Sequence, residues 1–274
     1  MIVYPNAKIN LGLRILRRND DGFHDLETVF YPVGWCDLLE ILPATSVRYR
    51  VRLTVSGSLL PGISRDNLVR RAALMMQERY RLPPLRIHLH KQIPAGAGLG
   101  GGSSDAAFTL RALNDLFGLD AAEKDLRTMA LSLGSDAPFF LMNRPALATG
   151  RGERLTPLSL SLAGWHLLII YPALHLDTAG MFRRITPRDE GASLREIISL
   201  PPEQWRDTLR NDFERTAGEL HPVITEILVR LYDAGALYAS LSGSGSAVYG
   251  LFRNEPPPLA WPDDYMIWQE SIKV

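Results

Sequence analysis

A glycine-rich segment at residues 94–104 is the part of the sequence whose residue types point most directly to chemistry. Five of its eleven residues are glycine and two are serine. An alternating apolar run at residues 85–90 precedes it, and apolar residues at helical spacing follow at residues 106–117. Backbone without a Cβ can approach a phosphate closely, and the N–H groups at a helix start favour an anion. The segment therefore predicts an anion-binding loop between a strand and a helix, with a flexible turn as the alternative.

Two common phosphate-binding patterns narrow the kind of loop. The Walker A pattern Gly-x-x-x-x-Gly-Lys-[Ser/Thr] does not occur. Gly96, Gly98 and Gly101 match the dinucleotide pattern Gly-x-Gly-x-x-Gly, but a Rossmann unit also needs a second strand that ends in an acidic residue about 20 positions on. A second helical pattern follows instead at residues 121–133. A nicotinamide-dependent oxidoreductase is therefore disfavoured.

Lys8 and Asp136 each lie in a well-defined local pattern. Apolar residues alternate with polar ones at residues 7–15, which predicts a half-buried strand with Lys8 and Asn10 on its solvated face. A lysine in such a position is normally only solvated. Asp136 follows Gly134, the expected C-cap of the second helix, and an aspartate there commonly supports a turn or caps the next helix.

The elements that must position these residues include both strands and helices. Asn67 precedes apolar residues at helical spacing, so it is the expected N-cap of a helix. Turn residues at 19–22 predict a hairpin or a longer loop between the first two strands. Further short apolar runs predict strands at residues 26–33, 38–42, 49–55, 165–171, 236–242 and 246–252. Since the chain has 274 residues and a domain has roughly 150, we expect two domains, residues 1–150 and 151–274, rather than one large one.

The charge balance argues against binding to nucleic acid. Lys plus Arg and Asp plus Glu both number 30, so the formal net charge is zero and no general positive field would hold a polyanion. The strongest apolar stretch, residues 165–171, is far shorter than the ~20 residues of a membrane-spanning helix, and the amino terminus lacks a secretory signal pattern. Cys36 is the only cysteine, which fits a reducing compartment. We expect a soluble, cytoplasmic protein that binds neither nucleic acid nor membrane.

Other candidate sites are weaker. His88 and His90 share a strand face, but no third ligand has suggestive spacing and no His-Glu-x-x-His occurs, so we expect a surface pair. No Gly-x-Ser-x-Gly occurs, which leaves a serine hydrolase without its nucleophile elbow. Residues 256–274 predict no function.

Three motifs, in this order along the chain, resemble those of the GHMP kinases, the superfamily of galactokinase, homoserine kinase and mevalonate kinase. Residues 5–11, Pro-x-Ala-Lys-Ile-Asn-Leu, resemble its first motif. Residues 94–107 read Pro-x-x-x-Gly-Leu-Gly-x-x-Ser-Ser-x-Ala-Ala and resemble the phosphate loop of that superfamily, and residues 241–246 resemble its third motif. The resemblance implies an α/β fold of the α+β type, in which two domains flank an active-site cleft.

Further segments narrow the resemblance to the branch of the superfamily that acts on 4-diphosphocytidyl-2-C-methyl-D-erythritol. They are Asp-Gly-Phe-His at residues 21–24, Asp-Asn-Leu at 66–68 and Leu-Gly-Ser-Asp-Ala-Pro at 133–138. The implied reaction transfers a phosphoryl group from ATP, with Mg²⁺, to the 2-hydroxyl of that substrate, a step of the non-mevalonate route to isoprenoid precursors. One departure is visible, because the branch usually has tyrosine where this chain has Phe23. An aromatic face is kept, but a hydroxyl and any hydrogen bond it makes are lost.

The same resemblance implies the catalytic and substrate-binding residues. Asp136 matches the catalytic aspartate that accepts the hydroxyl proton. Lys8 matches the catalytic lysine, which stabilises the aspartate as an anion and approaches the acceptor oxygen or the transferring phosphoryl group. Asn10 would orient the substrate hydroxyls. The residues expected at the cytosine are His24 as a direct contact, Phe23 as one stacking wall, and Phe182 as the opposite wall unless it is only a core aromatic.

The resemblance also implies an ATP site along the glycine loop. Ser103 and Ser104 would bind phosphate oxygens or the magnesium ion, with Ser104 as the expected metal ligand, unless both only cap the helix. Asn67 would lie near the adenine or only cap its own helix, and residues 243–245 would help to close the site or form a simple hairpin loop. The residues expected at ATP are Pro94, Ala95, Gly96, Ala97, Gly98, Leu99, Gly100, Gly101, Gly102, Ser103, Ser104 and Asn67.

Two other functions stay open on the sequence alone. Another small-molecule kinase of the superfamily, of the homoserine or mevalonate type, would need no stacking wall for a base, so Phe23 and His24 argue against it. A non-catalytic nucleotide-binding protein would not need both Lys8 and Asp136. The expected partners are ATP and a cytidine diphosphate-linked polyol, and the expected assembly is a monomer or a homodimer.

Overall fold

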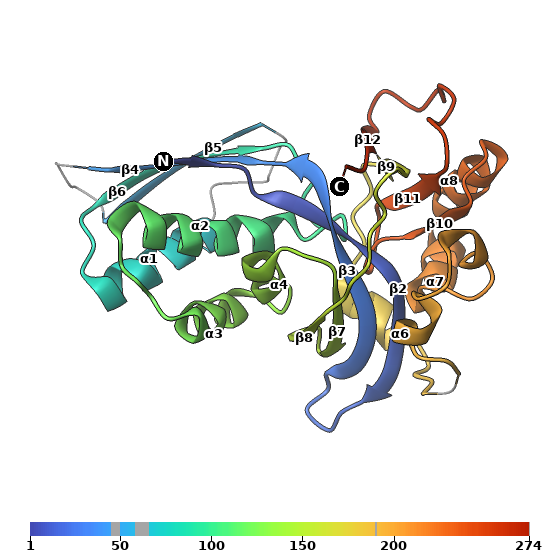
Figure 1. Cartoon of the computed structure of the whole chain (residues 1–274), viewed down its shortest axis with the longest axis horizontal. Coiled ribbons are helices and arrows are strands. Elements are labelled where there is room, and N and C mark those ends of the chain that lie inside the picture. Colours follow the sequence, from blue (N-terminus) through green and yellow to red (C-terminus); the bar gives the residue numbers. More distant parts are fainter. Residues whose placement is uncertain (45–49, 58–65, 190, 274) are drawn as a thin grey trace. The chain divides into compact units, whose positions relative to one another are not determined.

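The computed structural model describes residues 1–44, 50–57, 66–189 and 191–273 (Figure 1). They form two compact units, each made of several pieces of chain. Unit 1 consists of Met1–Ala7, Gly34–Ala95 and Gly100–Asn143, and unit 2 consists of Lys8–Val33, Gly96–Leu99 and Arg144–Val274. The glycine loop is thus divided, because its middle belongs to unit 2 and its two ends belong to unit 1. The division of the chain into residues 1–150 and 151–274 stays a prediction.

Unit 1 contains a four-stranded sheet in the order β1-β4-β6-β5. β4 is antiparallel to β1 and β6, whereas β5 is parallel to β6. Helices α1 to α4 lie on one side of this sheet (Figure 1), and the apolar residues of β4 and β6 that alternate along the strands are buried. The elements are β1 (Ile2–Val3), β4 (Leu38–Pro43), β5 (Val51–Gly57), β6 (Leu85–Lys91), α1 (Leu68–Tyr80), α2 (Gly101–Phe117), α3 (Glu123–Leu133) and α4 (Ala137–Met142).

The helix boundaries predicted in unit 1 are confirmed at the caps. The Asn67 side chain accepts a hydrogen bond from the Val69 N–H (2.9 Å) at the start of α1. Gly134 ends α3, and its N–H donates to the Ala130 carbonyl. The predicted strand at residues 49–55 corresponds to β5, although Tyr49 lies outside the described residues.

Unit 2 contains two four-stranded sheets, in the orders β2-β3-β7-β8 and β10-β11-β9-β12. β2 begins in unit 1 and β3 ends in unit 1, but most residues of both strands lie in unit 2. β12 adds an edge strand to the second sheet from the carboxyl-terminal segment to which the sequence assigned no role. The elements are β2 (Asn6–Arg18), β3 (His24–Cys36), β7 (Ala146–Gly150), β8 (Arg154–Pro157), β9 (His166–Tyr171), α5 (Thr178–Arg184), α6 (Leu194–Ile197), the 3₁₀ helix η1 (Pro202–Gln204), α7 (Asp212–Leu220), α8 (Pro222–Asp233), β10 (Tyr238–Leu241), β11 (Val248–Phe252) and β12 (Met266–Ser271).

The prediction of a solvated face on the first strand is wrong. Lys8 and Asn10 are only 3% and 2% exposed. The Tyr249 hydroxyl donates to the Asn10 carbonyl (2.8 Å), and the Ser242 hydroxyl accepts from the Asn10 N–H (3.3 Å). The alternating pattern indicates which face of the strand is polar, but it does not indicate which other segments cover that face. In the structure, other parts of unit 2 cover the polar face of β2.

None of the helices in the described part of the chain combines the length and the apolar character needed to cross a bilayer.

Candidate active site

Lys8 is a buried cation in unit 2, and it is held by polar and aromatic partners. Its Nζ donates to Asn10 Oδ1 (2.5 Å) and to the carbonyl oxygen of Gly98 (2.8 Å). The ring of Phe30 lies 5.0 Å from the ammonium. Because a buried charge is costly unless it is paired or hydrogen-bonded, these contacts fix the position of the ammonium beside the glycine loop.

Asn10 connects Lys8 to Thr28, which the sequence did not single out, and to Ser242, which lies in the third motif. Its Nδ2 donates to Thr28 Oγ1 (2.9 Å), and the Thr28 hydroxyl donates in turn to the Gly12 carbonyl (2.6 Å). The Ser242 hydroxyl lies 3.5 Å from Asn10 Oδ1. Thr28 lies on β3 and Ser242 follows β10, so no local sequence signal links them to Lys8.

The middle of the glycine loop is held by the first motif, by the third motif and by the residue that directly follows the third motif, all in unit 2. The Lys8 N–H donates to the Leu99 carbonyl (3.0 Å), and the Ala247 N–H donates to the Ala97 carbonyl (3.0 Å). The Ser242 hydroxyl donates to the Gly98 carbonyl (3.0 Å). Gly98 has φ +79°, and a Cβ there would overlap the Ser242 carbonyl oxygen. Three segments far apart in sequence therefore meet here, and only glycine fits at Gly98.

The carboxyl-terminal end of the glycine loop starts α2 in unit 1. Gly100 is the N-cap residue, with φ +72°, so the alternative that Ser103 and Ser104 cap this helix is wrong. Both serines lie inside its first turns. Ser104 is fully buried, and its Oγ has no hydrogen-bond partner among the described residues. An unsatisfied buried hydroxyl costs free energy, so Ser104 is a polar side chain that packing alone does not explain.

Asp136 precedes α4 in unit 1. It occupies the N-cap position with φ −82°, and Pro138 lies in the first turn of the helix. Within the described part of unit 1 its carboxylate makes no capping hydrogen bond. The Phe139 N–H donates instead to the Asp136 carbonyl (3.1 Å). The alternative that the carboxylate serves as a helix cap is therefore not supported.

His24 and Phe182 form an aromatic pair in unit 2. Their ring centroids are 5.0 Å apart and the rings are nearly parallel, at 25°. Phe182 also contacts Phe213 edge to face (4.9 Å) and packs against the core of unit 2 while remaining partly exposed. Burial lowers the pKa of His24, and the charge of Arg18 lowers it further. His24 is therefore a neutral imidazole at pH 7, able to donate one hydrogen bond and accept another.

Phe23 is 55% exposed in the turn between β2 and β3. The guanidinium of Arg151 lies 3.9 Å from its ring centroid and also forms an ion pair with Asp21. Arg151 was not predicted as a site residue, because nothing local to the turn after β7 indicates that it reaches Phe23. One face of the ring is thus covered by a cation.

Asn67, in unit 1, uses its side-chain oxygen as the cap of α1, which confirms the capping interpretation and leaves the adenine contact a prediction. His88 and His90 both hydrogen-bond to the hydroxyl of Ser56, at 2.8 and 3.0 Å. Across the described ranges, no group of three or more His, Cys, Asp or Glu side chains is arranged to hold a metal ion.

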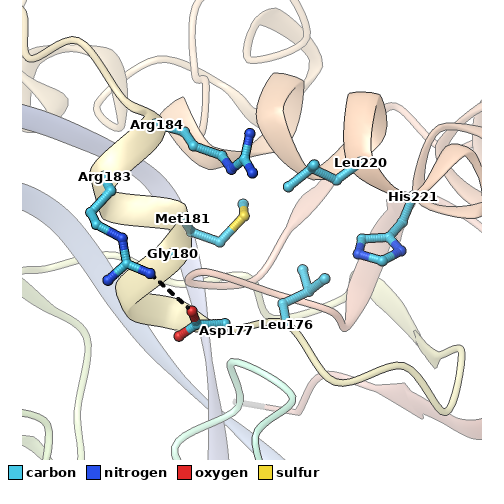
Figure 2. A pocket seen from close by; sticks show the side chains of 8 residues that line it. All are labelled: Leu176, Asp177, Gly180, Met181, Arg183, Arg184, Leu220 and His221. Atoms are coloured by element: carbon cyan, nitrogen blue, oxygen red, sulfur yellow. Dashed lines mark hydrogen bonds and ion pairs between the residues drawn. The ribbon is translucent and has the colours of Figure 1, made fainter.

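A pocket of about 370 Å³ lies beside α5 in unit 2 (Figure 2). Asp177 and Arg183 form an ion pair on one side of it (3.3 Å). Neither His24 nor Phe182 is among the described residues that line it. The lining residues are Leu176, Asp177, Gly180, Met181, Arg183, Arg184, Leu220 and His221.

Two family models match the chain. Residues 67–144 match the GHMP kinases N terminal domain, and residues 193–260 match the GHMP kinases C terminal domain. The first match includes the glycine loop with its two serines, and also Asp136.

Individual relatives narrow the comparison. The 4-diphosphocytidyl-2-C-methyl-D-erythritol kinase of Bacteroides thetaiotaomicron is 48% identical over 255 residues, which is 93% of each chain. A crystal structure of a 4-(cytidine 5′-diphospho)-2C-methyl-D-erythritol kinase superposes with a TM-score of 0.79 at 37% identity, covering 92% of this chain and 90% of that one. A homoserine kinase from Cytophaga hutchinsonii superposes with a TM-score of 0.62 at 16% identity, covering 97% and 94%. The last likeness shows the fold alone.

Proposed function

Because the chain belongs to the 4-diphosphocytidyl-2-C-methyl-D-erythritol kinases of the GHMP kinase superfamily, we propose that Lys8 and Asp136 carry out its phosphoryl transfer. The chain has the mixed α/β fold of that superfamily and is an ATP-dependent small-molecule kinase of the non-mevalonate pathway. The acceptor in the proposed reaction is the 2-hydroxyl of 4-diphosphocytidyl-2-C-methyl-D-erythritol, and the products are the 2-phosphate and ADP.

The observation that carries this proposal is the fixed ammonium of Lys8. It is buried and held between Asn10 and the Gly98 carbonyl of the glycine loop. Phosphoryl transfer depends mainly on positioning and on stabilising charge on the transferring group. A desolvated ammonium in a fixed position supplies that stabilisation without having to reorganise during the reaction. The contacts of Asn10 give it a second role besides the predicted contact with substrate hydroxyls, because it positions Lys8.

Asp136 is the proposed general base. A carboxylate that receives the proton of the attacking hydroxyl assists transfer to a weakly acidic alcohol. Its position before the short helix α4, with Pro138 in the first turn, suits this role because it limits movement of the backbone. The 2-hydroxyl oxygen would attack the γ-phosphorus in line while its proton passes to Asp136.

The glycine loop is the proposed site of the ATP phosphates. Gly98 admits no side chain, and Gly100 adopts a left-handed conformation at the start of α2, so backbone N–H groups there are accessible to an anion. The unsatisfied Oγ of Ser104 suits a phosphate oxygen or Mg²⁺. When bound, Mg²⁺ would neutralise charge on the phosphates, with Ser104 as the proposed protein ligand.

Phe23, His24 and Phe182 are the proposed cytosine site, and Arg151 joins them. The neutral His24 can exchange hydrogen bonds with the polar edge of cytosine, while aromatic rings stack on its faces. Arg151 covers one face of Phe23, so the base would stack on the other face. The cytoplasmic location and the monomeric or homodimeric state are further proposals.

The test is magnesium-dependent release of ADP from ATP with different acceptors. We expect release with 4-diphosphocytidyl-2-C-methyl-D-erythritol and none above background with homoserine, mevalonate or galactose. Release with one of the other acceptors would overturn the substrate assignment and keep the kinase fold. For the base, Asp136→Asn should abolish turnover and leave ATP affinity nearly unchanged, whereas near-normal turnover of this variant would overturn the role of Asp136.

A further inference from the structure

Three ionisable side chains are buried together in unit 1, and none of them is used by the proposed mechanism. Lys91 is the last residue of β6, Asp37 lies between β3 and β4, and Asp105 lies on α2. Lys91 and Asp105 are each 3% exposed, and Asp37 is fully buried. Because burying charges costs more than an apolar contact of the same size, their presence calls for an explanation beyond packing.

The contacts within this ionic cluster of Lys91, Asp37 and Asp105 are unequal. Lys91 Nζ donates to Asp37 Oδ2 and to Asp105 Oδ2, the latter at 2.8 Å. Asp37 Oδ1 accepts two more hydrogen bonds, from the N–H groups of Gln92 (2.6 Å) and Ile93 (2.9 Å). Asp105 Oδ1 has no partner among the residues that the structure describes. The Asp37 carboxylate therefore accepts three hydrogen bonds and the Asp105 carboxyl accepts one, so Asp37 is the more firmly held of the two.

Both ends of the glycine loop are attached to this cluster. Gln92 and Ile93, which Asp37 holds by their backbone N–H groups, lead directly into Pro94. At the other end, Asp105 lies one turn into α2, whose first residue is Gly101. A Cβ at Gly101 would lie 3.2 Å from Lys91 Nζ and 3.0 Å from Ile93 Cγ2. The start of α2 therefore lies directly against the lysine.

We propose that Lys91, Asp37 and Asp105 are positioning residues that hold the two ends of the glycine loop and thereby set the affinity of the enzyme for ATP. The inference rests on the proposed role of residues 94–104 in binding the phosphates. A segment with five glycines loses much conformational entropy when it becomes ordered. If the loop were not anchored, this entropy would be lost when ATP binds, and the affinity for ATP would be lower. The cluster removes this loss beforehand. Ionic hydrogen bonds suit the task because they are directional, whereas apolar contacts are not.

Variants of Asp105 separate this role from simple packing. Asp105→Ala removes the link between Lys91 and α2, and Asp105→Asn keeps an oxygen that can accept from Lys91 Nζ. The matched control is Ile41→Ala, a fully buried change on β4 in the same unit. We expect Asp105→Ala to weaken Mg–ATP binding at least ten-fold, measured by titration calorimetry, and Asp105→Asn to change it less than three-fold. Ile41→Ala should leave ATP affinity unchanged, although it lowers the melting temperature as much or more.

Steady-state kinetics give a second readout that general destabilisation would not move. We expect Asp105→Ala to raise the KM for ATP at least ten-fold and the KM for the cytidyl substrate less than two-fold. Equal ATP affinity in Asp105→Ala and the wild type, or equal weakening in Asp105→Ala and Ile41→Ala, would overturn the proposal. If the wild type itself failed to bind ATP, the proposed function and this proposal would both fail. If the wild type binds ATP and Asp105→Ala binds it equally well, only this proposal fails, so the two failures are distinguishable.

Hydrogen exchange on the wild-type enzyme requires no variant and covers the case in which Asp105→Ala does not fold. The N–H groups of Gln92 and Ile93 should be protected as strongly as those in the middle of α2, both with and without ATP. Exchange at the rate of an exposed loop would overturn the anchoring role of Asp37.

Discussion

The middle and the ends of the glycine loop are held in different ways. In unit 2, the middle is held by hydrogen bonds to its backbone carbonyls, donated by Lys8, Ser242 and Ala247. In unit 1, the ends are held by the buried ionisable side chains of Lys91, Asp37 and Asp105. The middle therefore depends on the absence of side chains on the loop itself, and the ends depend on the charges of side chains outside it.

The largest expected effect is at Gly98. A Cβ in Gly98→Ala would overlap the Ser242 carbonyl, and φ is +79°. Because backbone on both sides must move, we expect a loss of about 4 kcal/mol or more in the free energy of unfolding and no measurable ADP release. Urea unfolding and the kinase assay measure the two.

Gly164→Ala is the matched control for that clash. Gly164 also lies in unit 2, has φ +81°, and has nothing within 4 Å of an added Cβ. Gly164→Ala should cost only the strain of a left-handed backbone, about 1–2 kcal/mol, with activity retained. Equal losses in the two variants would mean that left-handed geometry, and not close approach to Ser242, makes glycine necessary in the middle of the loop.

The next effect distinguishes the two carboxyl groups at the ends of the loop. In Asp37→Asn one oxygen can still accept from the Gln92 and Ile93 N–H groups, but the amide nitrogen would then face the Lys91 ammonium. Breaking one side of a buried ion pair costs about 3 kcal/mol or more. Asp105→Asn keeps an acceptor for Lys91 and should cost less than about 1 kcal/mol. Denaturant unfolding of both variants tests this difference, and equal costs would contradict the division of roles.

The pH dependence of stability gives a smaller, directional effect. Burial raises the pKa of Asp105 to about 7, although Lys91 acts in the opposite direction. Between about pH 4 and 7 the folded state therefore binds a proton that the unfolded state releases, so this contribution to stability is present at low pH and disappears as the pH rises through about 7. Its size is on the order of a few kcal/mol.

Comparison of the wild type with Asp105→Asn isolates the contribution of the Asp105 proton to stability. The amide side chain of this variant does not titrate, so the stability of the variant relative to the wild type should increase from about pH 5 to about pH 8 in urea unfolding. Glu214 also has a pKa raised by burial, but it is present in both proteins and cancels in the difference. A difference that stays constant over this pH range would show that Asp105 is ionised throughout.

The sequence predicted the parts of this arrangement that depend on neighbours along the chain. Glycine density and helical spacing are local, so the loop, the helix after it, and the caps at Asn67 and Gly134 were predicted correctly. The burial of Lys8 was not, because strand alternation does not reveal which segment covers a polar face. The ionic cluster was not predicted either, because Asp37, Lys91 and Asp105 lie far apart in sequence. Resemblance to a family, and not the residues themselves, indicated His24 and Phe182 as site residues, and it did not predict that their two rings stack on each other.

The smallest expected effect concerns a charge that is exposed. Arg151 and Asp21 form an ion pair with side chains 42% and 50% exposed, and such pairs contribute little because solvent screens them. Arg151→Ala should remove the cation–π interaction with the Phe23 ring. Such an interaction contributes roughly 0.5–1 kcal/mol at an exposed position. We expect a two- to five-fold increase in the KM for the cytidyl substrate, with the KM for ATP and the stability nearly unchanged.

Asp21→Asn is the control, because it removes the ion pair and leaves the guanidinium able to cover the ring. It should change the KM for the cytidyl substrate less than Arg151→Ala does. If both variants have the same effect, the ion pair and not the stacking supports Phe23. If Arg151→Ala instead destabilises the protein as much as Asp37→Asn, exposed and buried charges would contribute equally here, and the contrast between the buried ends of the loop and the exposed surface would fail.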